Sequence, residues 1–349
     1  MSPELPSPAR YFPLDKGLYE VAPGLHPLGR DFGNGPLDAQ LFHVTRAFPR
    51  YRAQKLRCRE ERFGKYVGEH ALAPEVSCAV NRFLVTRLVA EHPSLFAIER
   101  ESGVAAGRAH EPSREQAVEL DGPFTLACAH TGDRIPFGAD LELREGAPEA
   151  SGFHSAFDAL CMQFESDLAV VRAEGAGETF RDWLARIHLC APSHWAAEDK
   201  LGLPFTAIHA PIPHIQKVNA AAESLVRAMI HRGPYVRFVW GFATDDRLNH
   251  HPEPPPGEDP GAWRGRAFDE ARAPSPFLLR VERQVTVGIP EASASLFGIH
   301  VSFIEGAEIR ANERERALFA SALRSLSPAS RVYKSIEGSL DRVLAYLEG

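Results

Sequence analysis

The sequence predicts an α+β protein in which helices pack against an antiparallel sheet. Three strand-like runs follow one another in the second half of the chain, at 235–242, 277–289 and 293–304. The last two are joined only by Ile289-Pro290-Glu291, which is far too short for the crossover that parallel strands require. Sequential strands with short turns therefore favour an antiparallel sheet with helices against one face, within roughly 155–305.

The first half of the chain predicts an extended arm, two helices and short hairpins. Residues 1–50 are rich in Pro and Gly and indicate an arm with few regular elements. Helical spacing of apolar residues predicts a helix over 78–92, and 100–152 indicates hairpins and loops. Ser155 is placed to cap a further helix, whose predicted apolar stripe consists of Phe157, Leu160, Cys161, Phe164, Leu168 and Val171.

The second half adds shorter elements around the three strands. We expect strands at 180–190 and 205–208, and helices at 215–232, 312–325 and 335–348. The loop between the first two of the three strands is rich in Pro and charge, so His250 and His251 are expected to be exposed. The predicted organisation is an N-terminal arm with a helical and loop region packing on the core, the core itself, and C-terminal helices, at 1–150, 151–310 and 311–349.

Composition and charge exclude several classes of function. The 349 residues carry 39 basic and 46 acidic side chains, a net charge of −7, with no long basic block, so nucleic-acid binding has no electrostatic support. No apolar run approaches the length of a membrane span, and the N-terminus lacks the apolar core of a secretory signal. Five widely spaced cysteines, an odd number, argue for a reducing compartment. A cytoplasmic protein is expected.

The segment 187–214 is unusually rich in histidine and proline. It holds four of the fifteen histidines, and His209 is followed by a stiff Ala-Pro-Ile-Pro run. A haem or non-haem metal needs an imidazole held in one orientation, but the residues alone favour a structural histidine that ties the end of a strand to a carbonyl. His188, Cys190 and His194 have the side chains of a zinc cluster, although packing on one strand face explains the first two as well.

Two strands carry charges that need partners. Arg237 lies in a run that otherwise has the pattern of a buried strand, so it requires an anion: a propionate or phosphate of a ligand, or a carboxylate such as Glu282. Alternation places Arg280, Glu282 and Gln284 on one face of the next strand. This face is either solvated or lines a polar pocket, in which Glu282 would take up a proton or hold an amine, with Arg280 tuning its charge.

Taken together, these motifs resemble the haem-dependent oxidative N-demethylase family. The resemblance rests on CAPSHW, a following Lys, IHAPIPH, VRFVWG, LRVERQVT and LFGIHVSFI, in that order, and on QFESDL at 163–168. It covers about 155–305 well and about 20–95 loosely. Three positions depart from the family pattern: Gly288 replaces an expected Arg, Phe238-Val239 precede Trp240, and Gly298-Ile299-His300 replaces a basic pair. His300 is therefore a candidate pocket residue of this chain.

The resemblance implies a PAS-like sheet that binds haem b and uses O₂ to oxidise a small N-methylated amine, releasing formaldehyde. Electrons would come from a separate flavin or iron–sulfur reductase, because the chain has no motif for such a cofactor. By motif, His209 is the candidate axial ligand, and Arg280 and Glu282 belong to the substrate side. The remaining candidates for cofactor contacts are Lys200, Arg237, Trp240 and His214. The alternatives are a non-catalytic haem-PAS sensor and a metal-free binding protein.

Overall fold

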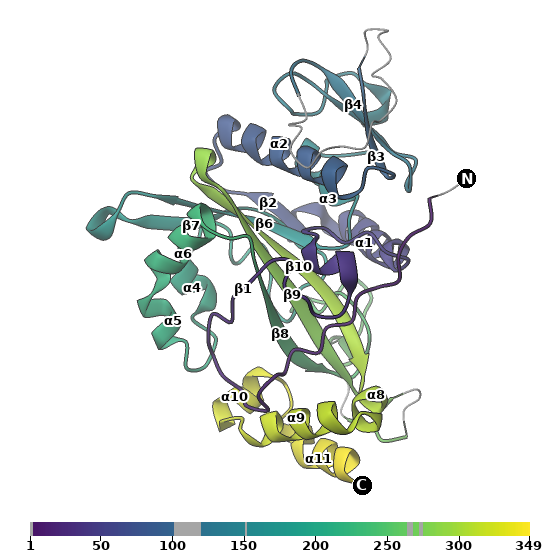
Figure 1. The fold of residues 1–349 in the computed structure, drawn as a ribbon, viewed down its shortest axis with the longest axis vertical. Coiled ribbons are helices and arrows are strands. Elements are labelled where there is room, and N and C mark those ends of the chain that lie inside the picture. Colours follow the sequence, from purple (N-terminus) through teal and green to yellow (C-terminus); the bar gives the residue numbers. More distant parts are fainter. Residues whose placement is uncertain (1–2, 101–119, 151, 264–267, 272–274) are drawn as a thin grey trace.

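The computed structural model describes residues 3–100, 120–150, 152–263, 268–271 and 275–349 and shows a mixed α+β fold (Figure 1). The strands of the main sheet are β1 (His26–Pro27), β2 (Val67–Glu69), β6 (Asp167–Glu174), β7 (Arg181–His188), β8 (Tyr235–Ala243), β9 (Leu278–Ile289) and β10 (Ala294–Glu305). Their order is β1-β8-β9-β10-β6-β7-β2, and every neighbouring pair is antiparallel. The predicted class and the three sequential strands are confirmed.

A second, smaller sheet and the helices surround the main sheet. The small sheet contains β3 (Phe96–Glu99), β4 (Phe124–Cys128) and β5 (Arg134–Phe137). The helices are α1 (Phe48–Tyr66), α2 (Pro74–Glu91), α3 (Ala156–Cys161), α4 (Phe205–His209), α5 (Gln216–Ala220), α6 (Ala222–His231), α7 (Pro260–Trp263), α8 (Gly306–Ala311), α9 (Glu313–Arg324), α10 (Pro328–Tyr333) and α11 (Leu340–Glu348). None of those in the described ranges has the length and apolarity needed to cross a bilayer.

The N-terminal arm is extended, as predicted, and runs past the sheet to the C-terminal helices (Figure 1). Arg10 forms an ion pair of 2.6 Å with Glu315 of α9, and the backbone N–H of Tyr19 donates to the Ser325 hydroxyl at 2.8 Å. These contacts join segments about 300 residues apart in the chain. The arm therefore covers the ends of β8 and β9 together with α8 to α11.

The helix capped by Ser155 is much shorter than predicted. The Ser155 hydroxyl accepts from the Asp158 N–H at 3.1 Å, which confirms the cap, but α3 ends at Cys161 and Leu168 lies in β6. The buried Lys55 ammonium of α1 donates to the carbonyl of Cys161, the last residue of α3, at 2.7 Å. It also donates to the Phe164 and Ser166 carbonyls before β6 at 2.8 and 2.7 Å. Because a side chain from another helix satisfies these carbonyls, the backbone does not need helical hydrogen bonds here. The apolar spacing alone therefore overestimated the length of the helix.

Helices α4, α5 and α6 connect β7 to β8. The predicted strand at 205–208 is wrong, because these residues form α4; the predicted helix at 215–232 divides at Ala221 into α5 and α6. Helix α6 packs on β9 and β10, and α4 contacts β7. Alternate residues enter different cores: Ala169 and Ile299 join a core with Ile208 of α4, whereas Val170 and Leu296 join a core with α2 and α3.

The absence of a side chain at Gly288 allows α6 to lie directly on β9. A Cβ at Gly288 would lie 1.9 Å from the backbone carbonyl oxygen of Ile230, so the Arg expected there cannot be accommodated without moving α6. We expect Gly288→Ala to lower the free energy of unfolding by about 1–3 kcal/mol through overpacking. Urea denaturation checks this. The matched control is Gly298→Ala on β10, where the nearest atom is Val285 O at 3.9 Å, and an equal loss there would contradict the packing explanation.

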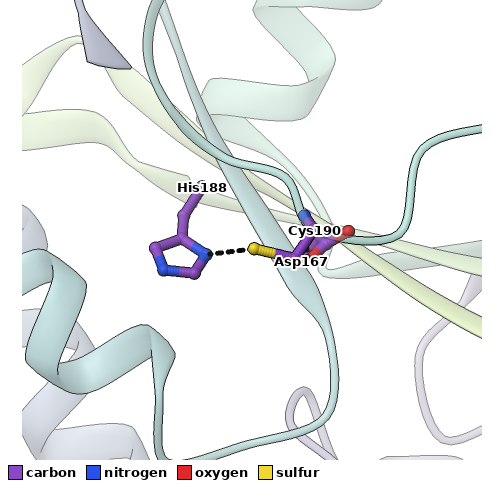
Figure 2. A group of neighbouring side chains, drawn as sticks. All are labelled: Asp167, His188 and Cys190. Carbon is purple, nitrogen blue, oxygen red and sulfur yellow. Dashed lines mark hydrogen bonds between the residues drawn. The ribbon is translucent and has the colours of Figure 1, made fainter. Parts of the chain in front are cut away.

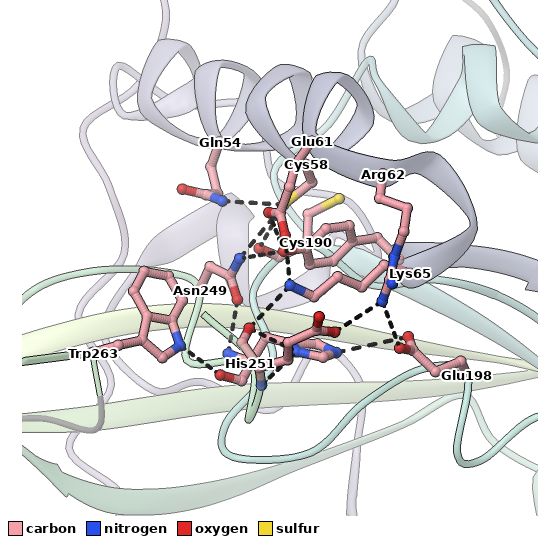
Figure 3. Close-up of polar contacts among 12 residues, drawn as sticks. Gln54, Cys58, Glu61, Arg62, Lys65, Cys190, Glu198, Asn249, His251 and Trp263 are labelled. Atoms are coloured by element: carbon pink, nitrogen blue, oxygen red, sulfur yellow. Dashed lines mark hydrogen bonds and ion pairs between the residues drawn. The ribbon is translucent and has the colours of Figure 1, made fainter. Parts of the chain in front are cut away.

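The prediction that His250 and His251 are exposed is wrong. Their exposed fractions are 6% and 3%, because the loop before α7 folds back onto α1 (Figure 3). Lys65 of α1 donates to the Glu253 carbonyl at 2.9 Å, and the Trp263 indole N–H donates to the His251 carbonyl at 2.6 Å. This Pro-rich polar loop is buried at His250 and His251 because side chains from other elements satisfy its backbone groups.

Candidate functional site

His209 lies at the end of α4 and is held in one orientation. Its Nδ1 donates to the Phe205 carbonyl at 2.7 Å, and its ring packs against the Phe205 ring at 4.1 Å between centroids. Burial lowers the pKa of His209, and the charges of Arg237 and Lys200 lower it further, whereas the bond to Phe205 opposes this. The neutral imidazole is therefore favoured, with its proton on Nδ1 and a free lone pair on Nε2.

Arg237 and Lys200 supply positive charge near this imidazole. Lys200 is half-buried and donates to the Ile208 carbonyl at 3.4 Å. Arg237 lies on β8, and no hydrogen bond or ion pair within the described ranges engages its guanidinium. Burial lowers the pKa of Arg237, and the charge of Glu282 opposes this. A half-buried guanidinium without a bonded anion is suited to hold a carboxylate or phosphate of a ligand.

Glu282 lies on the same face of the sheet. Strand register places Val239 of β8 and Val301 of β10 opposite Glu282, and it places Arg237 opposite Gln284. The Gln284 amide donates to Glu282 Oε2 at 2.9 Å. Oε1 lies 3.9 Å from Arg280 Nε. The predicted alternation is confirmed: Arg280 and Glu282 are buried on this face and Gln284 is half-buried. The ion pair between Arg237 and Glu282, one of the two partners considered for Arg237, is not formed in the structure.

The profile of a known family, described as haem-dependent oxidative N-demethylase, alpha subunit-like, matches residues 36–344. The chain belongs to this family. The match includes His209, Arg237 and Glu282 and extends well beyond the segment that carried the sequence resemblance.

The residues of this N-demethylase-family chain fit a haem on the face that carries Glu282. A histidine-ligated haem uses a neutral imidazole nitrogen, and its two propionates are suited to nearby cations. His209 offers a free Nε2, and Arg237 has no bonded partner among the residues that the structure describes. Ile299, Val301 and Phe303 of the same sheet face form an apolar core with Ile208 of α4.

Arg280 has a clear structural function in this family member. Its Nη2 donates to the Ala191 carbonyl at 2.6 Å, and its Nη1 donates to the Leu248 carbonyl at 3.0 Å. Only 2% of Arg280 is exposed. The guanidinium thereby joins the loop after β7 to the loop after β8, and its Nε faces Glu282. Arg280 is well placed to orient Glu282, although most of its N–H groups donate to backbone carbonyls.

The other two predicted cofactor residues have contacts elsewhere. Trp240 packs edge-on against Tyr19 and Phe319, in the core shared with the C-terminal helices. By strand alternation, its side chain leaves the face opposite to that of Arg237. His214 is exposed and its Nε2 bonds to the Ser327 hydroxyl at 2.9 Å. The structure does not group either residue with His209.

His300 is also separate from the face that carries Glu282. Its cross-strand partner is Arg283, and its Nε2 bonds to Glu165 at 2.8 Å, with the Tyr51 ring stacked at 5.2 Å. His300 therefore points away from the face that carries Glu282, and it contacts Glu165 and Tyr51 instead. His300 directly follows Ile299 in the strand, so its side chain points to the opposite face. There it bonds to Glu165 of the QFESDL motif.

Lys334 is a functional candidate that the sequence did not indicate. It is 7% exposed, and its ammonium lies 4.8 Å from the Trp240 ring centroid and 5.1 Å from that of Tyr19. It also donates to the Trp240 carbonyl. Burial lowers the pKa of Lys334 to about 8; Glu282 opposes this and Arg237 adds to it. The sequence carries no signal for it, because no periodic pattern distinguishes a buried lysine after a short helix from an exposed one.

The low pKa of Lys334 predicts a specific pH dependence of stability. Folded Lys334 loses its proton near pH 8, whereas an unfolded lysine retains it to about pH 10.4, so wild-type stability gains as pH rises through this window. Between about pH 8 and pH 10.4, we expect the unfolding free energy of wild type to rise by about 3 kcal/mol relative to that of Lys334→Met. Urea denaturation from pH 7 to 10.5 measures it. A difference independent of pH would contradict the low pKa.

Proposed function

We propose that the chain binds haem b between the sheet face that carries Glu282 and helices α4 to α6, with His209 Nε2 as the axial ligand. The observation that carries this proposal is the fixed, neutral His209 imidazole beside two cations, in a chain of this family. Arg237 and Lys200 would hold the propionates. The proposed reaction is the O₂-dependent oxidation of a small N-methylated amine to the demethylated amine and formaldehyde.

The arrangement of the central strands supports a PAS-like core. Strands β7-β6-β10-β9-β8 are consecutive in the sheet, and α4 to α6 are inserted between the second and third of them in the chain. His209 lies on α4 of these helices, and Glu282 lies on β9 of the sheet. A cofactor bound there would lie in the position where this class of fold holds its ligand.

Bound haem would supply the activation of O₂. In the overall reaction, the methyl carbon leaves as formaldehyde with one oxygen atom; the other oxygen becomes water on taking up two electrons and two protons. Glu282 would hold the alkylammonium through Oε1, because Oε2 already accepts from Gln284. Transfer of the ammonium proton to this carboxylate releases the nitrogen lone pair, and Arg280 keeps the carboxylate in place.

The proposed reaction would draw its electrons from a second protein. The proposed donor is a separate reductase that carries a flavin or an iron–sulfur centre, and the words "alpha subunit-like" in the family description support association with another subunit. Residues 311–349 and the N-terminal arm would then cover the core and form the outer surface that a partner subunit could contact.

Glu282→Gln tests the proposed substrate contact. A charged hydrogen bond to an ammonium contributes about 1.5–3 kcal/mol, so kcat/KM for a cationic methylamine should fall roughly 10- to 100-fold. The measurement is formaldehyde release by hemin-reconstituted protein with NADPH and a reductase, across a panel of methylamines. Glu291→Gln, an exposed acid in the turn between β9 and β10, is the control. Haem binding with no formaldehyde from any amine would contradict the proposed reaction and favour a sensor.

A further inference from the structure

Three side chains of metal-binding type meet where β6 begins and β7 ends. Asp167, His188 and Cys190 each offer one ligand atom, and these atoms lie within 4.8 Å of one another (Figure 2). The exposed fractions are 2%, 0% and 1%. His188 Nδ1 lies 3.9 Å from Cys190 Sγ. Sequence spacing indicated the second and third of these residues, but His194 instead stacks on His250 at 5.2 Å, and Asp167 takes its place.

The orientation of His188 suits a metal ligand. Its Nε2 lies 3.3 Å from Asp158 Oδ1. Asp158 is itself held by Arg59 at 3.1 Å and by the His154 N–H at 3.0 Å. A carboxylate can only accept here, so Nε2 carries the proton and Nδ1 presents its lone pair toward Cys190. A carboxylate behind the far nitrogen is the usual support of a metal-bound histidine.

The two acidic groups are positioned and are costly to ionise without a cation. Asp167 accepts from the Cys190 and Ala191 N–H groups at 2.9 and 2.7 Å, which aligns the carboxylate beside the thiol. Both side chains are buried, with exposed fractions of 2% for Asp167 and 1% for Cys190. A divalent cation would stabilise both ionised forms, because one thiolate and one carboxylate neutralise its two charges.

From this geometry we propose that Asp167, His188 and Cys190 bind one zinc ion, with water as the fourth ligand. A set of one thiolate, one imidazole and one carboxylate suits zinc better than calcium or magnesium, which prefer oxygen alone. Zinc bonds of about 2.3 Å to sulfur and 2.0 Å to nitrogen place tetrahedral ligands about 3.6 Å apart, close to the separation observed here. Cys58 lies beside Cys190 at the end of the polar network around α1 (Figure 3).

The site would have a structural function that is independent of haem. It joins the start of β6 to the end of β7 and to the loop that follows β7. The loop after β7 is the one that Arg280 holds through Ala191. Zinc would therefore stabilise the edge of the sheet that leads to α4.

The test is metal binding by the full chain in a phosphine reductant, without hemin. We expect zinc to copurify at up to one equivalent, and Co²⁺ added after chelator treatment to bind at one equivalent. The Co²⁺ complex should show the intense visible bands of tetrahedral coordination and a thiolate-to-cobalt charge-transfer band. Elemental analysis counts zinc and cobalt separately from iron, so failure of haem binding cannot be mistaken for failure of this site.

Variants locate the metal. Cys190→Ser should remove the charge-transfer band and lower Co²⁺ affinity at least 10-fold, whereas Cys128→Ser, which alters another buried free cysteine on β4, should change neither. Circular dichroism confirms that each variant folds. Absence of the charge-transfer band in the wild-type chain would overturn the proposal without any variant. Unchanged cobalt binding in a folded Cys190→Ser would overturn it as well.

Discussion

His209→Ala is expected to reduce haem affinity by more than about 100-fold and to weaken the Soret band of hemin-reconstituted protein. Loss of an outer partner of a metal-bound histidine already costs roughly 10- to 100-fold, and here the ligand itself is removed. The structure gives the physical reason: the Phe205 carbonyl fixes the proton on Nδ1, so Nε2 is free to bind iron. Titration with hemin, followed by absorption, measures the affinity of each variant.

The matched control for His209→Ala is His231→Ala. His231 is an exposed histidine at the end of α6, and its replacement should leave the spectrum and the affinity unchanged. Added imidazole should partly restore the spectrum of His209→Ala by occupying the space of the lost side chain. A Soret band of unchanged position and affinity in His209→Ala would contradict the axial assignment, whatever the activity of the protein.

Arg280→Met is expected to lower the free energy of unfolding by about 3–5 kcal/mol, before any effect on chemistry is considered. The substitution leaves the carbonyls of Ala191 and Leu248 buried without their donors, and it leaves Glu282 without its nearest cation. Arg280→Lys should recover only part of this loss, because one ammonium cannot reproduce a guanidinium that bridges two loops. Urea denaturation followed by far-UV circular dichroism measures both variants.

Arg181→Met on β7 is the control for Arg280→Met. Its side chain is 75% exposed and pairs with Glu174 at the surface, so its loss should change stability by no more than about 0.5 kcal/mol. If Arg280→Met kept wild-type stability and lost only turnover, the clamp between the two loops would be disproved. Arg280 would then act mainly on Glu282 or on the substrate.

The strands were more predictable than the helices. Strands β8, β9 and β10 carry alternating or continuous apolar residues between clear turn residues, and the connection at 290–292 is too short for any other topology. The helix after Ser155 and the strand at 205–208 were wrong, because short apolar runs fit either period. Lys55, which holds the carbonyls beyond α3, comes from about 100 residues earlier in the chain.

The candidate site divides in the same way. Local sequence was enough to place Glu282 and Gln284 on one strand face, since side-chain alternation is a property of neighbouring residues. The choice of His209 as the iron ligand came from the family resemblance and stays a prediction. Only the folded chain shows that Arg280 is mostly a clamp between loops, or that Asp167 faces Cys190. Those contacts join residues far apart in sequence, and which polar groups a buried charge meets is decided by packing and desolvation, which no local pattern records.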